Sequence, residues 1–171
     1  MKKILPLALI FPMLFSCGKE EVSNENTDVI IYNEEKGETT IENSAETVNQ
    51  IVIKAQEDMT FDKTEFAINA GEEVTLTLVN VGTSSKEAMG HNLIILNQGV
   101  DSSSFTFDAS SEKANEYIPE SRKADIIAHT KLLGPKENDQ IKFKIDQPGT
   151  YEFLCSFPGH SGSMRGKITV I

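Results

Sequence analysis

Three side chains that bind soft metal ions lie close together near the C-terminus of the chain. Cys155, His160 and Met164 follow a C-x4-H-x3-M spacing and offer a thiolate, an imidazole and a thioether to a single point. This donor set is typical of copper, whereas tetrahedral zinc sites prefer four strong donors and a thioether is a poor one. Pro158 and Gly159 favour a tight turn between the donors. The segment therefore predicts a copper site, with zinc as the second choice.

A second histidine, His91, lies far upstream in an M-G-H-N motif at residues 89–92, just before an apolar run. A lone histidine in such a setting is usually a hydrogen-bonded core residue. The glycine and asparagine that flank it, and the ligand still missing from the C-terminal segment, favour a ligand instead. His91, Cys155 and His160 would form the two-imidazole, one-thiolate plane of a blue-copper site, with Met164 as the weak axial ligand.

Three separate motifs, in the same order, resemble those of the azurin-like branch of the cupredoxins. They span residues 89–92, 127–134 and 155–164, and the resemblance as a whole covers residues 49–171. It implies a type 1 copper protein that carries single electrons, with one copper ion per chain. Unlike the family pattern, the chain has no cysteine pair to pin its first strands, and Leu93 stands where an aromatic residue is common.

The resemblance also implies roles for residues around the ligands. It gives Gly90 a backbone carbonyl near the metal on the face opposite Met164, and it gives Asn92 a hydrogen bond that ties the ligand loops together. We further expect Met89, Phe157 and Pro158 to surround His160 as an apolar docking patch, because weak redox encounters use small interfaces. The expected partners are redox proteins such as c-type cytochromes or copper reductases.

The pattern of residues 49–171 predicts an all-β fold. Apolar residues alternate with threonines at 74–78 and with lysines at 141–145, as in strands with one buried face. With the resemblance, this predicts a cupredoxin-like Greek-key β-sandwich of about eight strands. A short helical flap is expected within 101–120. The expected strands are 51–55, 65–69, 74–80, 91–97, 123–129, 140–145, 150–155 and 166–171.

The N-terminal part of the chain reads as an export signal followed by a linker. Residues 1–16 have the positive start and short apolar centre of a secretory signal. Cys17 then resembles the lipidated cysteine of a bacterial lipoprotein; the alternative is a plain signal with an unmodified cysteine. Residues 17–48 are polar and acidic, which predicts a flexible linker. We therefore expect an exported domain, lipid-anchored to a bacterial membrane and facing the periplasm or the cell surface.

Composition and ligand inventory exclude several function classes. The net charge of −10 makes nucleic acid an unfavourable partner. A copper enzyme with a second centre would need more histidines, and only His129 remains, which we interpret as a surface or structural residue. A binuclear copper site would need a second cysteine in the loop, and a cysteine hydrolase would need an exposed thiol. We therefore expect no enzymatic activity. Copper capture or delivery stays open as the alternative, with a copper-stabilised structural module as a third reading.

Overall fold

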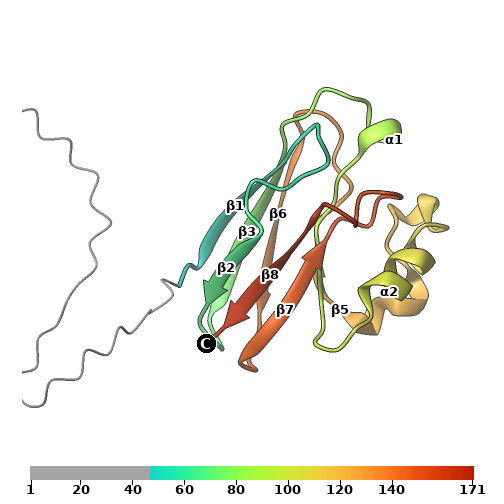
Figure 1. The fold of residues 1–171 in the computed structure, drawn as a ribbon. Helices are drawn as coiled ribbons and strands as arrows, with labels where there is room; N and C mark the ends of the chain where they lie inside the picture. The colour runs from blue at the N-terminus through green and yellow to red at the C-terminus, as the bar shows by residue number, and fades with distance from the viewer. Residues whose placement is uncertain (1–46) are drawn as a thin grey trace, which may run out of the picture. The chain divides into compact units, whose positions relative to one another are not determined.

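A computed structural model of the chain describes residues 47–171 and shows a sandwich of two β-sheets (Figure 1). The predicted signal at 1–16, Cys17 and nearly all of the linker lie outside the described residues. One sheet has the order β1-β3-β6 and the other the order β2-β8-β7-β4-β5, so the prediction of an eight-stranded sandwich is confirmed. The strands are β1 (Gln50–Ala55), β2 (Glu65–Ile68), β3 (Glu73–Asn80), β4 (Ile94–Leu96), β5 (Ile126–His129), β6 (Asn138–Lys144), β7 (Gly149–Leu154) and β8 (Arg165–Val170).

The core between the sheets follows from the alternation of apolar residues along each strand. In β3 the side chains of Val74, Leu76 and Leu78 are at most 1% exposed, while the threonines between them lie on the other face. From the facing sheet, Phe153 and Ile168 enter the same core. Removing such apolar surface from water is the main stabilising term for a sandwich of this kind.

A helical flap covers part of the outer face of the larger sheet (Figure 1). It consists of α2 (Ser102–Ala109), η1 (Lys113–Asn115) and η2 (Glu120–Asp125), which confirms the predicted flap. Phe105 and Ala109 of α2 are buried in a second apolar cluster with residues of β4 and β7. The remaining helix, α1 (Lys86–Met89), is a single turn. No helix within residues 47–171 is long and apolar enough to cross a membrane.

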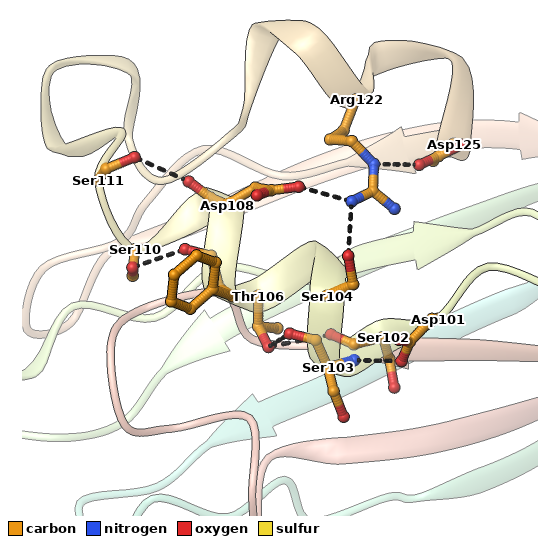
Figure 2. A network of polar contacts seen from close by, with 11 residues as sticks. Asp101, Ser102, Ser103, Ser104, Thr106, Asp108, Ser110, Ser111, Arg122 and Asp125 are labelled. Atoms are coloured by element: carbon orange, nitrogen blue, oxygen red, sulfur yellow. Dashed lines mark hydrogen bonds and ion pairs between the residues drawn. The ribbon is translucent and has the colours of Figure 1, made fainter.

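One arginine side chain joins two helices of the flap, as Figure 2 shows. Arg122 of η2 donates from Nη1 to Asp108 Oδ2 at 2.6 Å and to Ser104 Oγ at 3.3 Å, both on α2. Its Nε donates to Asp125 Oδ2 at 2.5 Å. The guanidinium carbon also lies 5.7 Å from the centre of the Phe105 ring. Together these contacts join η2 to α2.

Two predicted strands are shorter than expected. The strand predicted at 123–129 begins only at Ile126, because η2 occupies the residues before it and brings Arg122 and Asp125 together at i, i+3. The strand predicted at 91–97 is regular only from Ile94 to Leu96. His91 instead forms an isolated bridge with Leu133.

Candidate metal centre

Three separate segments bring the predicted ligands to one end of the core. Cys155 directly follows β7, where the side chains of Tyr151, Phe153 and Cys155 are all buried in the core cluster, as side-chain alternation requires. His91 is fixed by two backbone hydrogen bonds to Leu133, at 3.1 Å from the His91 N–H and at 2.8 Å to the His91 carbonyl. His160 is supplied by the turn that leads into β8.

Backbone hydrogen bonds close this turn on itself. The His160 N–H donates to the Phe157 carbonyl at 3.0 Å, and the Met164 N–H donates to the His160 carbonyl at 2.9 Å. The Cys155 N–H in turn donates to the Met164 carbonyl at 2.9 Å. The backbone hydrogen bonds of the turn therefore fix the spacing between Cys155, His160 and Met164 without the help of a metal.

His91, Cys155 and His160 lie around a single point. One ligand atom from each lies within 4.8 Å of the others. The Cys155 Sγ is 3.8 Å from His160 Nδ1, and the centres of the two imidazole rings are 5.0 Å apart. The three residues are at most 2% exposed. The arrangement offers one sulfur and two nitrogen donors in a site that excludes water.

One imidazole nitrogen in this cluster has no protein partner. Within residues 47–171, His91 Nδ1 is the one buried side-chain nitrogen or oxygen without a hydrogen bond. A buried polar atom without a partner costs free energy, and such an atom in a native protein calls for an explanation. A metal ion bound to this nitrogen would satisfy it, so the residues present fit the copper that the donor set predicts.

Burial shifts the pKa values of all three donors in the direction that favours the neutral form of each side chain. Burial, together with the nearby His160, lowers the pKa of His91 to about 4. Burial also lowers the pKa of His160. It raises the pKa of the Cys155 thiol to about 11, against the effect of backbone hydrogen bonds from Asn92 and Phe157. At neutral pH both imidazoles are therefore ready to bind a cation, whereas a metal must displace the thiol proton.

The two predicted axial groups lie in the segments that carry the main ligands. Met164 is fully buried in the core cluster and follows His160 in the closed turn. Gly90 is buried beside His91, and a Cβ at this position would lie 2.6 Å from the Lys86 carbonyl oxygen and 3.0 Å from Leu132 Cγ. Only glycine fits this space. The axial roles of Met164 and Gly90 stay predictions.

Asn92 joins the segment of His91 to the segment of Cys155. Its Oδ1 accepts from the Ser156 N–H at 2.9 Å, and its Nδ2 donates to Ser156 Oγ at 2.9 Å. Both residues are at most 1% exposed. Sequence reasoning did not single out Ser156; its place directly after Cys155 was the only available signal.

The residues predicted for docking differ in their exposure. Pro158 is exposed and Met89, the last residue of α1, is half-buried. Phe157 is 9% exposed and lies mostly beneath the surface, with its ring centre 4.6 Å from that of His160 and 5.0 Å from that of Tyr117. His129 is exposed on β5 and lies outside the metal cluster.

Relatives of known identity share this part of the chain. A model of the copper binding proteins of the plastocyanin/azurin family matches residues 45–171. Outer membrane protein H.8 of Neisseria gonorrhoeae is 32% identical over 122 residues, which are 70% of this chain and 66% of that protein. Azurin of Pseudomonas putida is 30% identical over 125 residues, which are 71% of this chain and 97% of the azurin.

Solved structures show the same fold. Dithionite-reduced auracyanin of Roseiflexus castenholzii matches with a TM-score of 0.64 and 34% identity, over 74% of this chain and 99% of the auracyanin. An azurin of Methylomonas sp. strain J matches with a TM-score of 0.63 at 23% identity, over 71% and 97% of the two chains, which supports the fold alone. With its buried cysteine and two histidines, this chain is a cupredoxin and belongs to the plastocyanin/azurin family of copper binding proteins.

Proposed function

We propose that the protein is a type 1 copper electron carrier that passes single electrons between redox partners outside the cytoplasm. The observation that supports this most is the buried cluster of His91, Cys155 and His160, in which His91 Nδ1 has no hydrogen-bond partner among residues 47–171 and is free to bind a metal. Bound copper would supply the one-electron couple. No substrate-binding group is needed for such a task, so we propose no enzymatic reaction.

The polypeptide's part in this function is to hold the donors still. A site that imposes one geometry on both oxidation states lets the ion change charge with little rearrangement. Three features favour such rigidity: the His91–Leu133 bridge, the closed turn before Met164, and the paired amide and hydroxyl groups of Asn92 and Ser156. Burial of all three donors also keeps water from adding to the coordination shell.

The route of the electron follows from what covers the site. Exposed Pro158 and half-buried Met89 lie in the segments that carry His160 and His91. We propose that partners dock on this apolar surface and that electrons leave through His160. The proposed partners are redox proteins such as c-type cytochromes or copper reductases, which would form small, short-lived interfaces.

The proposed location depends on the N-terminal sequence. Residues 1–16 resemble a secretory signal and Cys17 a lipidated cysteine. The relatives in Neisseria are named outer membrane proteins, which is consistent with an exported, membrane-tethered chain. Several acyl chains on Cys17 would anchor it stably, because burial contributes about 0.8 kcal/mol per methylene. Mass spectrometry of the chain purified from its native membrane would show the added acyl mass, and an unmodified Cys17 would refute the tether.

Visible absorption of the purified, copper-loaded chain tests the proposed function. An electron carrier should show an intense band in the red region that bleaches with a mild reductant and returns on reoxidation. Cys155→Ser should remove this band while far-ultraviolet circular dichroism still reports a folded sandwich. Absence of the band in the wild-type chain, with tight binding of the reduced ion only, would instead favour copper capture or delivery.

A further inference from the structure

Two consecutive residues between η1 and η2 adopt a backbone conformation that large side chains rarely take. Glu116 has φ 54° and ψ 30°, and Tyr117 has φ 62°, so both are left-handed. Residues other than glycine are uncommon in this region, and a bulky residue such as tyrosine especially so. Such strain persists only where surrounding contacts hold it, and it often marks functional positions.

Two carbonyl groups of this left-handed turn accept hydrogen bonds from Asn92 and Ser156, the buried residues that follow the ligands His91 and Cys155. The Glu116 carbonyl accepts a hydrogen bond from Asn92 Nδ2 at 3.1 Å. The Tyr117 carbonyl accepts one from Ser156 Oγ at 2.7 Å. The Asn92 amide and the Ser156 hydroxyl thereby obtain partners from outside their own segments, and the connection between η1 and η2 fixes their orientation.

The side chain of Glu116 contacts a different pair of segments, those of Leu132 and Lys86. Its Oε2 accepts from the Leu132 N–H at 3.0 Å, and its Oε1 lies 3.2 Å from Lys86 Nζ. Leu132 in turn packs against Gly90, where a Cβ would come within 3.0 Å of Leu132 Cγ. Through its carboxylate and its carbonyl, Glu116 contacts the chain on both sides of His91.

We infer that Glu116 is a positioning residue of the copper centre, acting through Leu132 on Gly90 and through Asn92 on the segment of Cys155. This inference rests on the proposed function, because it assigns Glu116 a part in tuning the copper couple. Loss of the carboxylate contacts would free Leu132 and let water approach the site. Water favours the more highly charged oxidised ion, so the reduction potential should fall.

Two substitutions separate the effect of the side chain from that of the backbone. Asparagine tolerates the left-handed conformation, but its shorter side chain cannot reach the Leu132 N–H. Glutamine keeps the length and an acceptor oxygen and loses only the charge that faces Lys86. Glu112→Asn is a matched control, since Glu112 is partly buried like Glu116, directly precedes η1, and its carboxylate makes no hydrogen bond or ion pair within residues 47–171.

The experiment combines amide hydrogen exchange of the metal-free chain with the reduction potential of the copper-loaded chain. Glu116→Asn should make the Leu132 amide exchange more than about tenfold faster, as expected for a lost charge-assisted hydrogen bond, and should lower the potential. Glu116→Gln should restore most of the protection and most of the potential. Glu112→Asn should match the wild-type chain in both measurements.

Three results would overturn the inference. One is an unchanged or raised potential in Glu116→Asn, even where its stability falls, because the role would then be structural only. Another is a Leu132 amide that exchanges as slowly in Glu116→Asn as in the wild-type chain. The third is a control variant, Glu112→Asn, in which the exchange rate and the potential change as much as in Glu116→Asn. A wild-type chain without a reversible copper couple would refute the proposed function instead, while the exchange measurement would still decide whether Glu116 holds Leu132.

Discussion

The three donors of the metal centre are held in their neutral forms by burial. His91 and His160 are at most 2% exposed, and the Cys155 side chain is fully buried. Desolvation disfavours the imidazolium and the thiolate alike, which is why the pKa of His91 falls and that of Cys155 rises. The metal-free site therefore carries no charge at neutral pH. A cation that enters it meets two free nitrogen donors and one thiol that must lose its proton.

The pKa of His91 makes the stability of the metal-free protein depend on pH. The ordinary pKa is 6.5 and the folded value about 4, so between these values the unfolded chain binds more protons than the folded chain. The contribution of His91 is fully present above pH 6.5 and is lost as the pH falls, reaching about 3 kcal/mol of lost unfolding free energy at pH 4.

Urea unfolding of the metal-free chain between pH 7 and pH 4 checks this expectation. His91→Gln should show a shallower loss of stability over this range than the wild-type chain. His129→Gln, which changes an exposed histidine outside the cluster, should keep the wild-type dependence. If the unfolding free energy fell equally with pH in the wild-type and His91→Gln chains, the lowered pKa of His91 would be contradicted.

At the scale of elements, the turn between β7 and β8 carries most of the site, and the pairing of these strands sets where the turn begins. β7 and β8 are antiparallel neighbours, with Phe153 opposite Gly166. A Cβ at Gly166 would overlap the Phe153 ring and the Thr64 carbonyl oxygen. The glycine therefore allows β8 to lie against both the Phe153 ring and the Thr64 backbone.

Gly166→Ala should destabilise the fold by about 1–3 kcal/mol, the usual cost of overpacking a filled core. Gly162→Ala is the matched control, because a Cβ at Gly162 meets no atom within 4 Å. Chemical denaturation of both variants measures the difference. A wild-type denaturation midpoint for Gly166→Ala would show that Phe153 and the Thr64 backbone, just before β2, move away at little cost.

Arg122 performs a comparable task for the flap, since its guanidinium bonds to both α2 and Asp125 (Figure 2). Arg122→Ala should speed amide exchange throughout α2 while leaving β7 unchanged, because only the flap loses contacts. Lys123→Ala removes a neighbouring, more exposed ion pair with Glu120 and should leave the exchange of α2 as in the wild-type chain. Faster exchange in β7 as well would mean that the flap and the sandwich unfold together.

At the scale of the whole described domain, the metal site is part of the hydrophobic core. Cys155 and Met164 belong to the same apolar cluster as Ile53 and Leu76 of the other sheet. Within residues 47–171, Cys155 is the single cysteine, so no disulfide restrains the unfolded chain there. Bound copper would therefore add a cross-link between the segments of His91, Cys155 and His160, beyond the hydrogen bonds of Asn92 and Ser156.

Copper should therefore raise the stability of the domain by mass action. A ligand that binds only the folded state at about 1,000 times its Kd adds about 4 kcal/mol, which is a rise in Tm of about 10 °C or more for a domain of this size. Thermal unfolding with and without copper measures the shift. Cys155→Ser should reduce it strongly, and an equal shift in this variant would place the stabilising metal elsewhere.

Local sequence patterns were sufficient to predict most strands and three of the proposed copper ligands. Alternating apolar residues predicted most strands, because burial of one face imposes a period of two. The spacing of Cys155, His160 and Met164 predicted the donor turn, because all three lie within ten residues. The M-G-H-N motif and the resemblance to azurins added His91, which no local spacing connects to the turn.

Only the tertiary structure decided how the distant segments meet. It showed that residues 123–125 belong to η2, since the Arg122 contacts with α2 and Asp125 outweigh the strand pattern. It also placed the Ser156 hydroxyl and the Glu116 carboxylate beside the site; the position of Ser156 next to Cys155 was the only hint of this in the sequence, and nothing marked Glu116. Periodicity along a chain reports which faces are buried, whereas the hydrogen bonds that orient ligands join residues dozens of positions apart, and only folding brings these together.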